Sequence, residues 1–293
     1  MSALQRQRIS RLVLPIVGLI ATLLACFDAA GAAEQTLEVA GLKVTEWSSD
    51  SAPRGPLPVI IFSHGFHGCA TQSRFLTEAL ASAGYLVFAP NHRDAACDGG
   101  ESSWHQRSEV PFVKPATWSE DSYRDRASDI RLLIEALRSD PKFKPRIDWS
   151  HLGLMGHSLG GYTVLGLAGA WPSWRLAGVR AVLALSPSQP FLAHGTLRDL
   201  FSPVMYQGGT RDFGVTPSIQ KNSGAYDESP APKYYVEFDA ATHFAWTNIG
   251  RVVRDQITAY SIAFMNIYLK GAPPDPILTR AMPGVAVLRS DLK

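Results

Sequence analysis

The chain has 293 residues, of which 46% are hydrophobic and 18% charged, a composition that supports a sizeable buried core and excludes a disordered chain. The net charge is 28 − 26 = +2 with His neutral, and no run of Lys or Arg appears, which argues against a nucleic-acid partner. The three cysteines are too few for a disulfide-stapled miniprotein and lack the paired spacing of a structural zinc site. We therefore expect no metal.

Residues 1–33 are predicted to be a secretory signal segment. A basic start precedes an apolar run over residues 12–27, and small residues that suit cleavage follow it. The run is shorter than the roughly 20 residues of a membrane-spanning helix, so no transmembrane domain is expected after processing. Two alternatives remain open, an uncleaved amphipathic anchor and a lipobox over residues 23–26 that would place a lipid anchor on Cys26. The protein is expected to be exported, either to the periplasm or to the medium.

Residues 34–293 are predicted to form a single domain in which strands alternate with helices. The opening segment, 36–47, is predicted to be an antiparallel pair. Further strands are predicted over 57–63, 85–89, 151–155, 179–185, 204–207 and 234–238, and helices over 73–83, 130–137, 159–170 and 252–269. A long polar stretch spans residues 91–122. The alternation predicts an α/β fold with a mainly parallel central sheet flanked by helices on both faces.

Cys69 and Cys97 are predicted to pair as a disulfide. Export would place both thiols in an oxidising compartment, where such pairs form. Each cysteine follows one of two consecutive predicted strands, so the strand ends could bring the two sulfurs together. The alternative is two buried free thiols.

One short motif indicates the chemistry. Gly156-His157-Ser158-Leu159-Gly160 fits G-x-S-x-G and lies between a predicted strand and a predicted helix. A sharp turn there would hold Ser158 at its tip, with room only for small residues two positions to either side. The turn also places Ser158 at a helix N-terminus, where N–H groups and the dipole favour a developing oxyanion. Ser158 is the predicted nucleophile, and the alternative is an ordinary glycine-rich turn.

A serine nucleophile needs a base, and the base needs an orienting acid. In hydrolases that carry this motif the chain order is Ser, then acid, then His. Only His194 and His243 follow Ser158, and His243 is the predicted base because it lies in a loop just past a predicted strand. Asp212 directly follows the strand at 204–207 and is the predicted acid. The competing acids are Asp199, Asp227 and Asp239.

The backbone N–H groups of Phe66 and Leu159 are predicted to form the oxyanion hole. Phe66 lies in a His-Gly-rich loop after a buried strand, and Leu159 follows the nucleophile. Three tryptophans are candidates for lining a substrate pocket, with packing in the core or in loops as the alternative. They are Trp104, Trp118 and Trp246.

Six segments together resemble the α/β-hydrolase superfamily. They are SHGFHG (63–68), APNHRD (89–94), RDRASDIRLLIEAL (124–137), GHSLGG (156–161), GGTRD (208–212) and ATHF (241–244). Within the superfamily the chain most resembles exported dienelactone-hydrolase-like and platelet-activating-factor-acetylhydrolase-like serine esterases, with bacterial cutinase-like polyesterases nearby. The resemblance covers roughly residues 57–270.

This resemblance implies a carboxylic-ester hydrolase without a cofactor, acting on a small-molecule, lipid or polymer ester through Ser158, Asp212 and His243. The chain departs from these families in two places. Dienelactone hydrolases carry a cysteine where this chain has Ser158, and no cysteine follows Cys97 to form the C-terminal disulfide of many cutinase-like enzymes. A serine peptidase or amidase on the same fold and a non-catalytic binding protein are the alternative functions.

Overall fold

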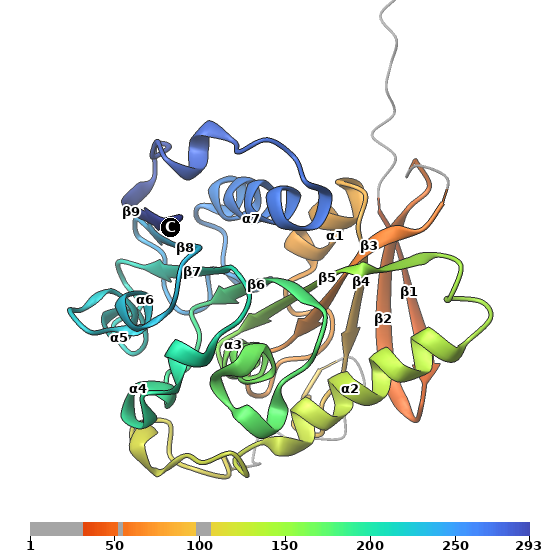
Figure 1. Ribbon diagram of the computed structural model, residues 1–293, viewed down its shortest axis with the longest axis horizontal. Helices are drawn as coiled ribbons and strands as arrows, with labels where there is room; N and C mark the ends of the chain where they lie inside the picture. Colours follow the sequence, from red (N-terminus) through yellow and green to blue (C-terminus); the bar gives the residue numbers. More distant parts are fainter. Residues whose placement is uncertain (1–31, 52–54, 98–106) are drawn as a thin grey trace, which may run out of the picture.

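The computed structural model describes residues 32–51, 55–97 and 107–293, which contain a nine-stranded sheet (Figure 1). Its strands are β1 (Ala32–Val39), β2 (Leu42–Ser49), β3 (Leu57–Ser63), β4 (Leu86–Pro90), β5 (Ile147–His157), β6 (Val179–Leu185), β7 (Val204–Gly209), β8 (Lys233–Phe238) and β9 (Val285–Asp291). Their order across the sheet is β1-β2-β4-β3-β5-β6-β7-β8-β9. The pairs β1–β2, β2–β4 and β8–β9 are antiparallel, and the pairs between β4 and β8 are parallel. The predicted mainly parallel sheet is confirmed.

Helices cover both faces of the sheet. They are α1 (Arg74–Ser82), α2 (Arg124–Ser139), α3 (Leu159–Leu165), α4 (Phe191–His194), α5 (Thr216–Gln220), α6 (Ala225–Glu228) and α7 (Arg254–Lys270). Short 3-10 or π segments are η1 (Pro115–Thr117), η2 (Gly166–Ala170), η3 (Pro172–Trp174), η4 (Thr196–Asp199) and η5 (Pro276–Leu278). In Figure 1, α1 and α7 lie on one side of the sheet, and α2 and α3 lie on the other.

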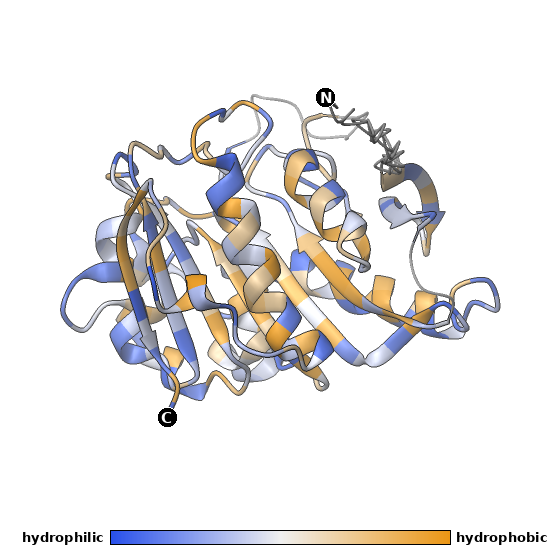
Figure 2. Cartoon of the chain, turned by 90° about the horizontal axis from the view of Figure 1, so that it is seen from above, coloured by the Kyte–Doolittle hydropathy of each residue, from blue (hydrophilic) through white to orange (hydrophobic). Residues whose placement is uncertain are grey.

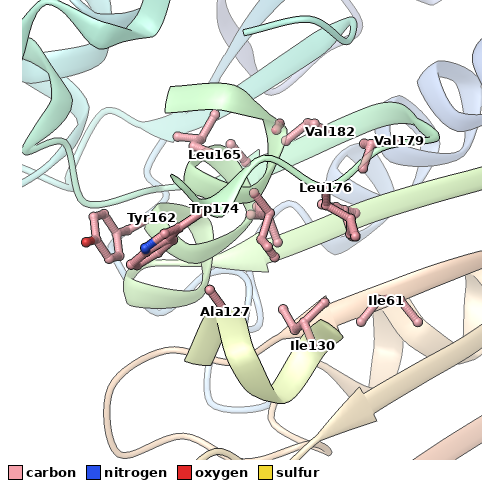
Figure 3. Close-up of a cluster of buried hydrophobic side chains, with 14 of the residues drawn as sticks. Ile61, Ala127, Ile130, Tyr162, Leu165, Trp174, Leu176, Val179 and Val182 are labelled. Atoms are coloured by element: carbon pink, nitrogen blue, oxygen red, sulfur yellow. The ribbon is translucent and has the colours of Figure 1, made fainter. Parts of the chain in front are cut away.

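The sheet therefore separates two hydrophobic cores, and strand β3 contributes to both. Its alternate residues Val59 and Ile61 pack on the side of α2 and α3. The intervening residues Ile60 and Phe62 pack on the side of α1 and α7. Figure 3 shows Ile61 in the first core with side chains of α2 and α3, and Figure 2 shows the hydrophobic colouring of the central strands. Because both faces are buried, the strand is a continuous apolar run rather than an alternating one.

Several elements differ from the sequence-based prediction, including the short helices α4, α5 and α6, which were not predicted, and α2, which begins at Arg124. Strand β5 begins at Ile147, because its first residues pair with Leu57 and Pro58 of β3 before the register shifts. Helix α3 ends at Leu165 and continues as the π segment η2, which contains Gly169 at φ 121°. Strand β9 was not predicted, although it pairs with β8 along its whole length.

The predicted disulfide between Cys69 and Cys97 is confirmed. The two Cα atoms lie 5.4 Å apart, and the bridge joins the segment after β3 to the segment after β4. Adjacent parallel strands end at the same edge of the sheet, which is why the two sulfurs meet.

The predicted signal segment, with Cys26, falls outside the described residues except for its end, Ala32 and Ala33, which lie in β1. Within the described ranges no helix is both long and apolar enough to span a bilayer.

Candidate active site

The carboxyl ends of the parallel strands meet at one edge of the sheet, and the candidate site lies at this edge. Ser158 follows β5, Asp212 follows β7 and His243 follows β8. Ligand and catalytic groups in open α/β sheets gather at this edge, because the loops that leave the strands there are neighbours. Three side chains that are far apart in the sequence are thereby brought together.

The turn that carries Ser158 has an unusual backbone. Ser158 has φ 55° and ψ −115°, a conformation that L-residues rarely adopt, and it immediately precedes α3. A Cβ atom at Gly156 would lie 2.1 Å from the carbonyl oxygen of Gly160, and one at Gly160 would lie 1.9 Å from that of Ser63. Larger residues at both positions would therefore collide with backbone atoms, which agrees with the steric argument from the motif.

His243 lies between the other two predicted triad residues. Its Nε2 atom is 2.9 Å from Ser158 Oγ. On the other side of the ring, Nδ1 is 3.3 Å from Asp212 Oδ1 and 3.4 Å from Oδ2. The imidazole thus faces the serine hydroxyl with one nitrogen and the carboxylate with the other, which is the relative arrangement that a base and its orienting acid require.

A second serine, Ser186, stands between His243 and Asp212 and was missed in the sequence. Its Oγ atom donates a hydrogen bond to Asp212 Oδ2 and lies 2.9 Å from His243 Nδ1. Ser186 is fully buried, follows β6 and has φ 44°. A serine directly after a strand at the active edge is the only signal that the sequence offers for it.

Asp212 is kept ionised by its neighbours. Burial alone would raise the pKa of this carboxyl, but the hydrogen bond and charge of His243, together with the Ser186 hydroxyl, lower the pKa below its usual value. Only 3% of the residue is exposed, so water contributes little to this balance. The carboxylate therefore presents a negative charge to His243 Nδ1 at neutral pH.

His157, the second residue of the motif, ties two loops of the site together. Its Nδ1 accepts a hydrogen bond from Gln72 Nε2 at 3.0 Å, and its Nε2 donates to the carbonyl oxygen of His243 at 2.8 Å. Gln72 in turn accepts from the N–H of Gly65 at 3.1 Å through Oε1. Burial, and then the charge of nearby His243, lower the pKa of His157 to about 3. His157 is therefore a neutral positioning residue.

The loop that holds the predicted oxyanion donor Phe66 lies against the serine. A Cβ atom at Gly65 would lie 3.4 Å from Ser158 Cβ and 3.1 Å from His157 Nδ1, so the loop backbone packs closely against both residues. Phe66 lines the cavity in front of Ser158, and Leu159 is the first residue of α3. Both predicted N–H donors thus belong to segments that flank the nucleophile.

A cavity of about 1100 Å³ opens in front of Ser158 and His243. Trp118, one of the three candidate tryptophans, is among its lining residues. Trp246 is not, because it is fully buried and its indole N–H donates to Gln207 Oε1 at 2.8 Å. The prediction that Trp246 binds substrate is therefore corrected: it packs beneath the site, beside His157. Trp104 lies outside the described residues.

Gln189 in the cavity wall leads to a stability prediction. Only 7% of the residue is exposed, and neither amide atom has a hydrogen-bond partner among the described residues. A buried unpaired polar group costs about 1–3 kcal/mol. Gln189→Met, which keeps the shape and removes both polar atoms, should therefore raise the free energy of unfolding by about 1 kcal/mol and Tm by about 2–4 °C in thermal denaturation.

Gln207→Met is the matched control. Gln207 is also buried, but its amide donates to Ser261 Oγ at 3.0 Å and accepts from Trp246. The same substitution should lower Tm there, because it leaves Trp246 Nε1 without its acceptor. A lower Tm in both variants would contradict the prediction for Gln189.

The chain is similar to a family of acetylhydrolases and to several cutinases. The family model for platelet-activating factor acetylhydrolase, isoform II, matches residues 18–109, a stretch that holds the SHGFHG loop but not Ser158. Cutinase est2 of Thermobifida alba is 25% identical over 214 residues, which are 72% of this chain and 59% of that protein. Cutinase 2 of Thermobifida cellulosilytica is 28% identical over 214 residues, 72% of this chain and 68% of the relative.

A third relative is named as a lipase. The monoacylglycerol lipase of Mycolicibacterium smegmatis is 29% identical over 126 residues, 43% of this chain and 36% of the lipase. The chain spans about three fifths of the length of the two Thermobifida alba cutinases, est1 and est2. Together with the mainly parallel nine-stranded sheet, these similarities support an α/β-hydrolase fold for the chain.

Proposed function

We propose that this protein is a serine carboxylic-ester hydrolase that works through an acyl-enzyme intermediate on Ser158. The proposal rests chiefly on one observation, the 2.9 Å contact between His243 Nε2 and Ser158 Oγ at the mouth of a large cavity. A hydroxyl this close to a neutral imidazole can lose its proton to Nε2 as it attacks a carbonyl carbon.

In the proposed mechanism, His243 takes the Ser158 proton while Oγ bonds to the ester carbonyl carbon. Asp212 stabilises the imidazolium that forms, and the N–H groups of Phe66 and Leu159 hold the tetrahedral oxyanion. Each such donor is worth about 3 kcal/mol in the transition state of comparable enzymes. His243 then protonates the leaving alcohol, and water repeats the attack on the acyl-enzyme with His243 again as the base.

The proposed substrates are esters with an apolar acyl or alcohol part. The support is the cavity wall, where Phe112, Phe213 and Phe244 are 40%, 80% and 54% exposed and present apolar surface beside Ser158. The names of the relatives, cutinase and monoacylglycerol lipase, fit lipid or polymer esters of this kind. No cofactor has a role in this chemistry.

We also propose that the protein acts outside the cytoplasm, in the periplasm or the medium. The disulfide between Cys69 and Cys97 supports export, because such bridges persist in oxidising compartments. Whether the predicted signal ends in cleavage or in a lipid anchor on Cys26 is decided by the mass of the mature N-terminal peptide.

The proposed function is tested with purified protein, a fluorophosphonate probe and two matched substrates. The probe should label one serine, found at Ser158 by peptide mass spectrometry. A p-nitrophenyl ester should be hydrolysed with a kcat/KM at least about 100-fold above that of the p-nitroanilide with the same acyl group. Faster cleavage of the anilide would indicate a peptidase or amidase, and neither labelling nor turnover would indicate a non-catalytic binding protein.

A further inference from the structure

A buried ion pair lies behind the loop that carries Phe66, and the mechanism above does not use it. Arg126 of α2 is fully buried, and its guanidinium contacts Asp94 through two hydrogen bonds, Nε to Oδ1 at 3.0 Å and Nη2 to Oδ2 at 2.9 Å. Its other N–H groups donate to two backbone carbonyls of the loop, His64 O at 2.7 Å and Gly65 O at 3.3 Å, and to Ser63 Oγ at 3.4 Å. One guanidinium thus joins α2, the segment after β4 and the loop after β3.

Burying such a pair is a poor way to gain stability, because the desolvation cost offsets much of the attraction between the charges. The pair holds backbone groups in one orientation instead. A planar guanidinium with donors in a fixed fork is suited to this role, since it can bind a carboxylate and two carbonyls at once.

His64 acts on the same loop in a single tautomer. Its Nε2 accepts the backbone N–H of His92 at 3.0 Å, so the ring proton is on Nδ1, which donates to Gly65 O at 2.7 Å. Burial, and then the charge of Arg126, lower the pKa of His64 well below its usual value. His92 is itself held by Ser63 Oγ at 2.9 Å and by Asp129 Oδ2 at 2.8 Å.

The carbonyl oxygen of Gly65 therefore accepts three hydrogen bonds, from His64 Nδ1, from Arg126 Nη2 and from the N–H of Gly68 at 2.9 Å. In a planar trans peptide, the C=O and the following N–H point in opposite directions. With the Gly65 carbonyl fixed toward Arg126, the N–H of Phe66 points away from Arg126, and Gly65, Phe66 and Ser158 all line the cavity.

We propose that Arg126, Asp94 and His64 are positioning residues that aim the Phe66 N–H at the oxyanion. This inference rests on the proposed function and adds a specific cause for its oxyanion hole. It also assigns a joint role to three segments of the sequence, SHGFHG, APNHRD and RDRASD, each of which supplies members of this buried network.

The first test is Arg126→Lys, measured against Arg146→Lys. A lysine at 126 can still pair with Asp94, but its ammonium has no fork to hold both carbonyls. We expect kcat for a p-nitrophenyl ester to fall about 10- to 100-fold with KM within about twofold, since one oxyanion donor is worth about 10²–10³ in kcat. Arg146 directly precedes β5 and pairs with the buried carboxylate of Glu46 in β2. This pair lies at the opposite end of the strands from the loop, so the Arg146→Lys variant should keep kcat.

A pair of inhibitors distinguishes a misoriented Phe66 N–H from general damage to the site. An alkyl trifluoromethyl ketone forms an oxyanion on Ser158, whereas the corresponding secondary alcohol occupies the cavity without one. In Arg126→Lys the inhibition constant of the ketone should rise by about the factor by which kcat falls, because both report transition-state stabilisation. The inhibition constant of the alcohol should not change. An equal rise for both inhibitors would overturn the proposal.

A second pair of variants, at His64, tests the same positioning role even if Arg126→Lys does not fold. The amide nitrogen of an asparagine at 64 lies where His64 Nδ1 lies, while that of a glutamine reaches only the position of Nε2. His64→Gln should lower kcat about tenfold at unchanged KM, and His64→Asn should recover most of the loss. Equal kcat values in these two variants would refute the role of His64. A wild-type protein that neither binds the fluorophosphonate nor hydrolyses esters would instead refute the proposed function itself.

Discussion

Replacing Ser158 by Ala should lower kcat/KM for a p-nitrophenyl ester by about 10⁴-fold or more, the scale of nucleophile deletions in serine hydrolases. The variant lacks the oxygen that forms the acyl-enzyme, while His243 and the cavity are left in place. The fold should survive, because Ser158 Oγ has its contact at the site with His243 rather than in the core. The measurement is initial-rate kinetics together with fluorophosphonate labelling, which should disappear.

Ser128→Ala is a suitable control for this prediction. Ser128 is exposed on α2, and its hydroxyl donates to the carbonyl oxygen of Arg124 in the same helix. Its variant should keep full turnover and labelling. If Ser158→Ala retained turnover near the wild-type value with a normal circular dichroism spectrum, the nucleophile would be a different group.

The parts of the site that depend on short-range sterics could be predicted from the sequence. The glycines at 156 and 160 mark the turn because any larger residue would meet backbone atoms, and such a rule needs no knowledge of the rest of the fold. Asp212 and His243 were predicted on different grounds, because each lies just past an apolar run that indicates a buried strand and the two follow Ser158 in the order acid, then His. The structure places His243 next to Ser158 and Asp212 next to His243.

Other features depend on contacts between distant segments that no local pattern reveals. Ser186 reaches Asp212 only because β6 ends between β5 and β7 with Ser186 at φ 44°. Trp246 was expected in the cavity, but the buried amide of Gln207 holds its indole in the core instead. Strand β9 follows a Pro-rich segment and pairs with β8 at the edge of the sheet, where a short run of alternating residues carries little signal.

Asp212→Asn should lower kcat for the ester by about 10³–10⁴-fold, because an amide at this position can donate to Nδ1 and so favour the wrong imidazole tautomer. The carboxylate it replaces is buried and has a lowered pKa, so the wild-type charge is present at neutral pH. Single-turnover kinetics with a p-nitrophenyl ester measures the loss, which raising the pH to 9 should not recover. A loss below about tenfold would mean that His243 does not depend on this charge.

Ser186→Ala distinguishes the contribution of the bridging hydroxyl from that of the carboxylate. The hydroxyl is the nearest partner of His243 Nδ1, at 2.9 Å, whereas Asp212 lies at 3.3 Å. Its removal leaves the charge in place to attract the ring, so we expect a loss in kcat of only about tenfold, the scale of one hydrogen bond of about 1.4 kcal/mol. The double variant with Asp212→Asn should lose little more than Asp212→Asn alone, because the hydroxyl acts by linking the carboxylate to the ring. Fully additive losses would show instead that Ser186 and Asp212 act on His243 independently.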